Sequence, residues 1–388
     1  MATTRRIFIS DLHLGTDRSV QTHYPYCWLN KHAKYLTRFL GQLIRRDDVS
    51  ELVILGDMLD DWVIPANFDP EPGSDYQSTF DAICKAEQNK TIIKRLKTLA
   101  SPDSGVRVSY VPGNHDMAVT RDFLETTFPG IHCLGDYQPG TGVYHSSNIF
   151  AEHGHRFCLF NAPDDLTGTQ DYLPLGYYIS RCVAKEAMED GDGLDVMATL
   201  ARFIKELFKE DQNIPVSVLS TVAREAGMQG NSRFRMPAGQ AAVTVARVKR
   251  RFADLMAQWN ASPLHPDTDA VQALLADVGA LEPVIWRVYG KPLKKPRIVV
   301  CGHTHAYAMY GGDRHGYTSL ANGDDSDNPA WDGYKFIYAN SGTWVDSTSL
   351  RTYVETEERP EQGRHYVRVK KFTSSGKSVV MMGSYTRI

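Results

Sequence analysis

The stretch RRIFISDLHLG, residues 5–15, combines two features that recur along the chain. Its first half is a short apolar run containing β-branched residues, which is typical of a buried β-strand. Its second half places Asp11 and His13 directly after that run. Residues 28–44 then carry apolar side chains at helical spacing, so a strand followed by an amphipathic helix is predicted.

The same order of elements repeats through the first part of the chain. Strands are predicted at residues 51–57, 106–114 and 147–154, and helices at 80–100 and 121–128. Strands that are separated by helices pair in parallel, so this alternation predicts an α/β fold.

The pattern changes after residue 160, where helical spacing dominates. Helices are predicted at residues 194–210, 243–259 and 271–281, and strand-like segments return at 297–301, 335–345, 365–372 and 378–384. The simplest organisation is one α/β core made of residues 1–160 and 296–388. A helical insertion, residues 161–295, interrupts this core and is a candidate cap over a site.

Composition limits the class of protein. The 388 residues are 42% hydrophobic and 23% charged, and the formal net charge is −3, which does not favour nucleic acid as a partner. The six cysteines show no Cys-x-x-Cys spacing, so reduced thiols are expected. The first residues lack the apolar core of a signal peptide, and no apolar run is long enough to span a bilayer. A cytoplasmic protein is expected.

Clusters of polar side chains follow the predicted strands. They are Asp11 with His13, then Asp57, then Asn114 to Asp116, then His153 with His155, and finally His303 with His305. The carboxyl ends of strands in an open α/β sheet line one crevice, so we expect these clusters to meet although they span almost 300 positions.

The chemistry of these side chains favours metal binding. Carboxylate, amide oxygen and imidazole together form a mixed nitrogen and oxygen ligand set that suits Mn, Fe, Zn or similar ions. There are more candidate ligands than one tetrahedral ion needs, which indicates two ions about 3.5–4 Å apart that share a carboxylate. Each cluster alone could be an ordinary loop, but all of them together, each at a strand end, favour a functional site.

The clusters also form recognisable blocks. They read DLH at 11–13, GDMLD at 56–60, GNHD at 113–116, HGH at 153–155 and GHTH at 302–305. In these blocks the chain resembles the calcineurin-like metallophosphoesterase family. The resemblance implies a four-layer α/β/β/α sandwich and two divalent ions, with Mn²⁺ favoured and Fe, Zn or Mg as alternatives. It also implies hydrolysis of a phosphate ester by a hydroxide that bridges the ions.

The resemblance assigns a role to most of these residues. It implies that one ion is held by Asp11, His13, Asp57 and His305. It implies that the other is held by Asp57, Asn114, His153 and His303, so that Asp57 bridges.

Two assignments concern the remaining residues of the blocks. His155 is an alternative to His153 as the ligand from the fourth block, but His153 is favoured because it comes first after the strand. The resemblance implies that His115 donates a proton to the leaving group and that Asp116 orients the His115 ring.

The substrate is less defined than the reaction. The segments FISDLHLG and GDMLDDW resemble the UDP-2,3-diacylglucosamine hydrolase branch, which also carries a helical insertion. This chain departs from that branch, because its best-known bacterial members have arginine where His115 stands and their insertion is shorter. We therefore expect hydrolysis of a phosphomonoester or phosphodiester. A pyrophosphatase for a sugar nucleotide or lipid precursor is one alternative, and a non-catalytic metal-binding scaffold is another.

Three residues are candidates for contact with a small phosphorylated substrate. They are Trp62, Arg18 and His155, and Trp62 could instead pack beneath the cap. A basic run in the insertion comprises Arg247, Lys249, Arg250 and Arg251. It could meet substrate phosphates or make a peripheral contact with an anionic membrane, or it could be the solvated face of a helix. One such run gives little support to a nuclease.

Overall fold

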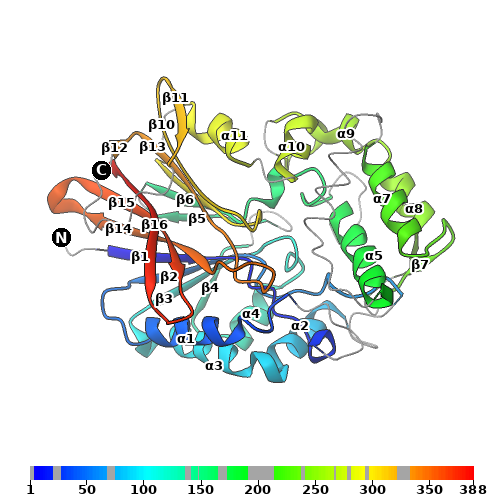
Figure 1. The fold of residues 1–388 in the computed structure, drawn as a ribbon, viewed down its shortest axis with the longest axis horizontal. Coiled ribbons are helices and arrows are strands. Elements are labelled where there is room, and N and C mark those ends of the chain that lie inside the picture. Colours follow the sequence, from blue (N-terminus) through cyan, green and yellow to red (C-terminus); the bar gives the residue numbers. More distant parts are fainter. Residues whose placement is uncertain are drawn as a thin grey trace.

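The computed structural model describes most of the chain. The described residues are 4–20, 28–67, 75–135, 141–146, 148–164, 173–190, 214–236, 241–265, 268–277, 281–292, 297–320 and 333–388. Two sheets form the centre of the molecule, and helices cover both of their outer faces (Figure 1).

The larger sheet has eight strands in the order β12-β16-β15-β14-β1-β2-β3-β4. Its parallel half consists of β1 (Thr4–Ile9), β2 (Glu51–Leu55), β3 (Arg107–Val111) and β4 (Ile131–Cys133). Its other half consists of β14 (Thr352–Arg359), β15 (Arg364–Phe372), β16 (Ser378–Arg387) and the short β12 (Gly333–Tyr334). β14 pairs with β1 in antiparallel fashion, so the prediction of parallel pairing is confirmed only for the first half.

The smaller sheet has six strands in the order β11-β10-β13-β9-β6-β5. The strands are β5 (Tyr144–Ser146), β6 (Ile149–Ala151), β9 (Ile298–Cys301), β10 (Tyr307–Asp313), β11 (Gly316–Ser319) and β13 (Phe336–Ser341). β9 lies between β6 and β13 and is parallel to both, so its carboxyl end lies beside that of β6.

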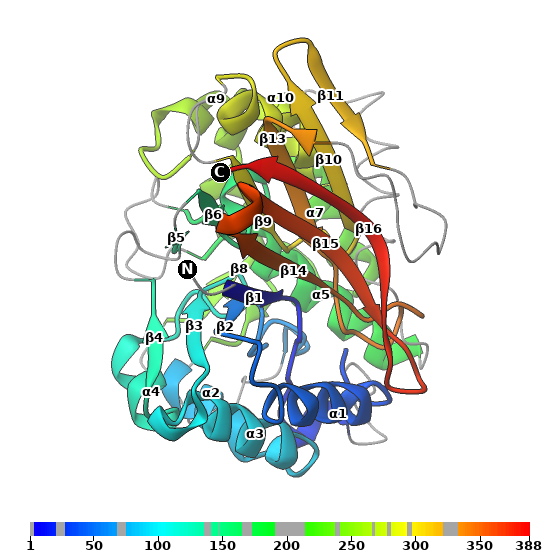
Figure 2. The ribbon, with the colours of Figure 1, turned by 90° about the vertical axis from the view of Figure 1, so that its left-hand side faces the viewer.

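Four helices cover the outer face of the larger sheet. They are α1 (Ala33–Leu43), α2 (Tyr76–Lys85), α3 (Lys90–Ala100) and α4 (Arg121–Thr127). Figure 2 shows them gathered on one side of β1–β3, with the strands of the smaller sheet on the other side. In α1 the buried side chains include Leu36, Leu40 and Leu43, whose spacing gives one apolar face.

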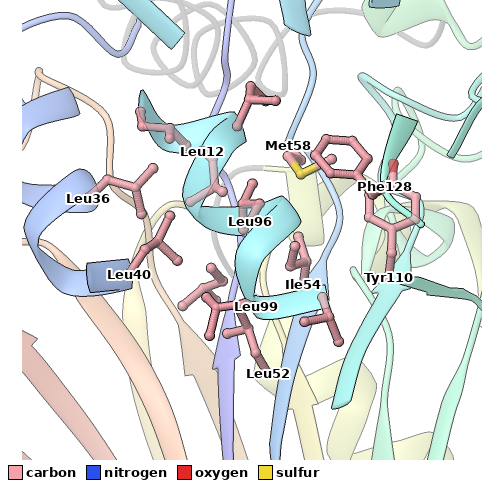
Figure 3. Close-up of a cluster of buried hydrophobic side chains, with 14 of the residues drawn as sticks. Leu12, Leu36, Leu40, Leu52, Ile54, Met58, Leu96, Leu99, Tyr110 and Phe128 are labelled. Atoms are coloured by element: carbon pink, nitrogen blue, oxygen red, sulfur yellow. The ribbon is translucent and has the colours of Figure 1, made fainter. Parts of the chain in front are cut away.

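Alternation along β2 explains how one strand serves two layers. Leu52 and Ile54 pack with the helices, where they meet Leu96 and Leu99 of α3 (Figure 3). Val53 and Leu55 point the other way and join the apolar layer between the two sheets. Successive side chains of a strand face opposite sides, so a continuous apolar run is expected for a strand that is buried on both faces.

The fourth layer covers the outer face of the smaller sheet. It includes α11 (Leu281–Ile285), the π-turn η6 (Trp286–Gly290) and the end of α10 (Ala270–Asp277), which pack near Val299 and Cys301. The predicted four-layer α/β/β/α sandwich is confirmed. Part of the segment predicted as an insertion therefore serves as a layer of the sandwich.

The other helices of the insertion form a core of their own. They are α5 (Leu175–Asp190), α7 (Ile214–Glu225), α8 (Val245–Phe252) and α9 (Leu255–Gln258), with a two-stranded ribbon of β7 (Arg233–Phe234) and β8 (Val243–Thr244). Figure 1 places α5, α7 and α8 together at the end of the molecule away from the two termini. The core contains Tyr178, Val218, Val248 and Trp259. We name these helices and this ribbon the cap.

The helices of the cap differ in part from the predicted ones. The prediction of a single helix at 243–259 is wrong. The first two residues of that range form β8, and the rest divides into α8, which ends at Phe252, and α9, which begins at Leu255. Thr244 begins α8 by accepting a hydrogen bond from the backbone N–H of Arg247. The helix predicted at 194–210 lies outside the described residues. Within the described part of the chain, no helix combines the length and apolar character needed to cross a membrane.

Candidate metal centre

The polar clusters lie in loops that follow strands of both sheets. β1, β2 and β3 of the larger sheet and β6 and β9 of the smaller sheet each end immediately before one cluster. β1, β2 and β3 run parallel to one another in the larger sheet, and β6 runs parallel to β9 in the smaller sheet. Their carboxyl ends therefore lie together, and the structure brings the predicted ligands to one buried place.

One group of ligand atoms comes from Asp11, His13 and His305, which lie within 4.8 Å of one another. Nε2 of His13 lies 3.0 Å from Nε2 of His305, which in turn lies 3.3 Å from Oδ1 of Asp11. We name these three residues the first ligand group.

A second group comes from Asp57, His153 and His303, also within 4.8 Å of one another. Nε2 of His153 lies 3.2 Å from Oδ2 of Asp57 and 3.1 Å from Oδ1 of Asn114. The same Asp57 oxygen lies 3.8 Å from Nε2 of His13, so Asp57 stands between the two groups. We name Asp57, Asn114, His153 and His303 the second ligand group.

The donor atoms of the second group are arranged for a cation. Nδ1 of His153 lies 2.6 Å from the backbone carbonyl of Leu55, and a carbonyl only accepts, so Nδ1 carries the proton. In the neutral ring Nε2 is then a lone pair facing the oxygens of Asp57 and Asn114. Burial would lower the pKa of His153, but the Asp57 carboxylate raises it to about 9. The negative charge of Asp57 therefore favours a positive charge at the centre, either a proton on His153 or a metal ion.

Asp11 gives a second sign of the same kind. Its Oδ1 atom is buried and has no hydrogen-bond partner among the described residues, whereas Oδ2 accepts from the backbone N–H of His303 at 3.0 Å. A buried acceptor without a donor is costly. Together with the converging lone pairs, this oxygen shows that the residues present fit divalent cations.

The backbone is held in an unusual conformation at this place. Among the described residues, the non-glycine residues with positive φ are Asp11, His13, Asp57, His303 and His305, with φ between 46° and 72°. Such a conformation costs roughly 1–3 kcal/mol for a residue with a side chain. All of them were predicted ligands, so the strain is concentrated where it aims side chains into the centre.

The close packing of the loops requires one glycine in particular. A side chain at Gly113 would collide with the Asp57 side chain and backbone. Gly113 belongs to the GNHD block, and its backbone N–H donates to Asp116 at 2.7 Å. The third block can therefore lie directly against the second.

His115 is oriented by Asp60 and not by Asp116, so this part of the sequence prediction is wrong. Nδ1 of His115 donates to Oδ1 of Asp60 at 2.8 Å, while Oδ2 of Asp60 accepts from Nδ1 of His13 at 2.7 Å. One carboxylate thus fixes two rings. Burial would lower the pKa of His115, but the Asp60 and Asp57 carboxylates raise it to about 9.

Asp116 instead binds the backbone. Its carboxylate accepts from the N–H groups of Asp57 at 3.2 Å, Met58 at 2.8 Å, Leu59 at 3.2 Å and Gly113 at 2.7 Å. Burial raises the pKa of Asp116 to about 6. Because it ties the second block to the third, its contribution to the centre is to hold the turn that carries Asp57.

The three candidate substrate residues have different outcomes. Trp62 is only 1% exposed, and its ring stacks on that of His115, with centroids 4.2 Å apart, and meets Tyr177 of the cap, which agrees with the alternative that it packs beneath the cap. Its contact with a substrate stays a prediction. His155 is buried with its ring 5.4 Å from that of His153, but only His153 belongs to a ligand group, which favours His153 as the ligand. Arg18 is half-buried in the short turn η1 (Asp17–Val20), and its role stays a prediction.

Sequence reasoning missed a tryptophan at the centre. The half-buried ring of Trp28 lies 4.4 Å from the ring of His13, 5.1 Å from that of His305 and 5.9 Å from that of His115. The sequence placed Trp28 in a helix, but α1 begins only at Ala33. Its position shortly after the first block was the one available signal.

The fold and the site together define a metal-dependent phosphoesterase class. The chain belongs to the calcineurin-like phosphoesterase family, because the model of that family matches residues 4–212, more than half of the chain. The matched range contains the first four blocks. His303 and His305 lie beyond it, and the structure brings them to the same centre.

Comparison with solved structures gives distant likenesses. One is to a chain described as GAP50, the anchor in the inner membrane complex of Plasmodium, at 9% identity and a TM-score of 0.33, covering 98% of this chain and 89% of that one. Another is to PhoD, at 8% identity and a TM-score of 0.34, covering 98% and 69%. A search of curated proteins gave no match.

Proposed function

We propose that the protein hydrolyses a phosphomonoester or phosphodiester at a centre of two divalent ions, with Mn²⁺ as the favoured metal. The observation that carries this proposal is the pair of ligand groups that converge on the shared carboxylate of Asp57. Membership of the calcineurin-like phosphoesterase family supports the same class of reaction.

The residues divide the work of binding between them. The first ligand group, together with Asp57, would hold one ion, and the second ligand group would hold the other. When bound, such ions act as Lewis acids that neutralise charge on phosphoryl oxygens and make water more acidic. The chain contributes fixed donors, because backbone hydrogen bonds to Asp11 and Asp116 hold these loops before any substrate arrives.

His115 is suited to donate a proton to the leaving-group oxygen. Its Nδ1 is engaged by Asp60, so its Nε2 is directed at the centre, 4.0 Å from Oδ2 of Asp57. The Asp60 carboxylate favours the protonated form of the ring and raises its pKa against the effect of burial. Trp62 packs on the ring from the cap side and restricts its position.

A catalytic role is favoured over a non-catalytic scaffold by one specific feature. A scaffold needs ligands but has no use for an acid beside them. Here the buried carboxylate of Asp60 holds His115 through Nδ1 and also accepts from Nδ1 of His13. We propose that His115 acts as this acid and not as a ligand, although its ring also lies close to donor atoms of His13 and Asp57.

The cap is the feature that we propose limits the substrate to a small phosphorylated molecule. Trp62, which follows the second block, packs against Tyr177 in the core of the cap. The side chains of the α/β core and of the cap are therefore in contact across the boundary proposed at residue 161. Arg251 of the basic run pairs with Asp164 inside the protein, whereas Arg247 and Arg250 are exposed. A peripheral membrane contact through Arg247 and Arg250 stays a prediction. A sugar-nucleotide substrate also stays a prediction.

Metal removal tests the proposed function. The full-length protein, stripped with EDTA and dialysed, is expected to be inactive towards bis-p-nitrophenyl phosphate and p-nitrophenyl phosphate. Addition of Mn²⁺ is expected to restore release of p-nitrophenol from at least one of them, followed by absorbance. Mn²⁺, Zn²⁺, Fe²⁺ and Mg²⁺ added separately to the same preparation identify the metal that supports the highest rate.

A wider panel decides the substrate class. It should include nucleotides, sugar nucleotides and alkyl phosphodiesters, assayed for released phosphate or by chromatography. A folded protein that binds two ions but is inert towards the whole panel would support the scaffold and contradict the proposal.

A further inference from the structure

A chain of hydrogen bonds starts in the insertion and ends at the centre. Asp277 is the last residue of α10, Asn161 lies in the turn after η4 (His155–Phe157), and Asn114 belongs to the second ligand group. All three side chains are buried, with exposed fractions of 5%, 7% and 1%. No part of the resemblance gives Asp277 or Asn161 a role.

Each hydrogen bond in this chain has a fixed direction. Oδ1 of Asp277 accepts from Nδ2 of Asn161 at 2.9 Å. Oδ1 of Asn161 then accepts from Nδ2 of Asn114 at 3.2 Å. With its nitrogen engaged, Asn114 presents Oδ1 to the centre, where it lies 3.1 Å from Nε2 of His153.

The orientation of Asn114 matters because an amide has two unlike ends. Its oxygen can bind a cation, whereas its NH₂ group has only donors and would repel one. The two ends are nearly equal in size, so packing alone does not select between them. A hydrogen-bond partner must do so, and Asn161 is in turn an amide whose own orientation has to be set.

Asp277 can set that orientation because both of its oxygens accept. Oδ2 accepts from the backbone N–H of Phe160 at 2.9 Å, which fixes the carboxyl group against the turn. A second backbone bond, from Leu159 N–H to the carbonyl of Ala273 at 3.2 Å, anchors α10 to the same turn. Oδ1 is then the oxygen that faces Asn161 and accepts from its Nδ2.

We infer that Asp277 is a positioning residue for the second ligand group, acting through Asn161 to turn the amide oxygen of Asn114 towards a bound ion. The inference rests on the proposed function, because it needs an ion at that group. It also gives α10 a purpose beyond covering the sheet: the orientation of a ligand depends on a residue of the inserted segment.

An amide at position 277 tests the direction of the relay. In the Asp277→Asn variant the new oxygen stays on Phe160 N–H, so the new NH₂ faces Asn161. Asn161 then has to turn its oxygen to that group and its NH₂ to Asn114, which must present its own NH₂ to the ion. Loss of a residue that orients a ligand typically costs about 10- to 100-fold in metal affinity. That loss is expected at one of two sites in calorimetric Mn²⁺ titration of the stripped full-length protein.

The exchanged double variant provides the matched rescue. In Asp277→Asn combined with Asn161→Asp, the amide at 277 donates to one carboxylate oxygen at 161. The other carboxylate oxygen accepts from Asn114, so the ligand keeps its orientation. Both affinities are expected to return to within a few-fold of the parent. Asn161→Leu, which removes both bonds without a large change in volume, is expected to bind as weakly as Asp277→Asn.

The control is Asp164→Asn. Asp164 is also buried, lies in the same segment as Asn161 and pairs with Arg251 of α8, but it is not part of the relay. It is expected to lower the melting temperature without changing either affinity, which separates loss of stability from loss of orientation.

The outcomes distinguish this inference from the proposed function. Parental Mn²⁺ affinities in both Asp277→Asn and Asn161→Leu would overturn the relay alone, as would a double variant as weak as the single one. Weak binding in Asp277→Asn with normal binding in Asn161→Leu would show that Asp277 acts directly, and would also overturn it. A parent protein that binds no divalent metal would overturn the proposed function and the relay together.

Discussion

Replacement of Asp57 by asparagine is expected to abolish hydrolysis and to remove at least one ion. Asp57 is buried, stands between both ligand groups and has a pKa held well below its usual range, because His153 and His115 outweigh the effect of burial. Loss of one partner from a buried charge pair costs about 3–5 kcal/mol, or roughly 10²- to 10⁴-fold in an affinity. Mn²⁺ titration and the rate with bis-p-nitrophenyl phosphate measure the two effects.

A control from the same strand makes this result specific. Glu51 begins β2, is also buried and accepts hydrogen bonds from Ser109 and Tyr144, far along the strand from Asp57. Glu51→Gln is expected to lower the melting temperature but to retain two ions and activity. An Asp57→Asn protein that still binds two ions and hydrolyses the ester at a comparable rate would rule out a shared carboxylate.

Replacement of His115 by alanine is expected to lower kcat by about 10²- to 10⁴-fold, the usual contribution of a general acid, while two ions stay bound. The physical reason is that Asp60 engages Nδ1 of His115, and the ring belongs to neither of the two named ligand groups, although it also lies within 4.8 Å of donor atoms of His13 and Asp57. The loss should depend on the leaving group. p-Nitrophenolate leaves readily without a proton, so the loss should be smaller for its esters than for an alkyl ester of the same phosphate.

The comparison of the two ester types separates an acid from a structural residue. A loss that is equal for both leaving groups would point to distortion of the centre, for example through the stacked Trp62 ring. Loss of an ion from the His115→Ala protein would show that His115 is a ligand. Asp60→Asn should reproduce part of the leaving-group dependence, because Asp60 holds the ring.

The sequence predicted which loops come together because the signal is local. Each block follows an apolar run, and parallel pairing of β1, β2 and β3 brings the ends of those runs together. The sequence did not reveal the hydrogen-bond partner of His115, because that partner is close in the folded structure and not adjacent in the sequence. Asp116 is adjacent in sequence, but its carboxylate faces backbone N–H groups, whereas Asp60 reaches the ring from another loop.

The strand β14 shows a second limit of reading a sequence. Its segment TYVETEER is rich in glutamate, so hydrophobic periodicity does not mark it. In the sheet Glu357 pairs with Arg368 at 2.7 Å and Glu355 with Lys370 at 3.2 Å, both on the neighbouring β15. The glutamates interrupt the apolar pattern of the strand in the sequence. In the sheet they form ion pairs with basic residues of β15, and these pairs depend on how the two strands are aligned.

The most direct test of the two-metal centre is anomalous diffraction from a crystal of the full-length protein loaded with Mn²⁺. The expected result is two peaks about 3.5–4 Å apart, separated by the Asp57 carboxylate. One should lie within bonding distance of Asp11, His13 and His305, and the other of Asn114, His153 and His303. A single peak, peaks away from these residues, or none at saturating Mn²⁺ would contradict the account.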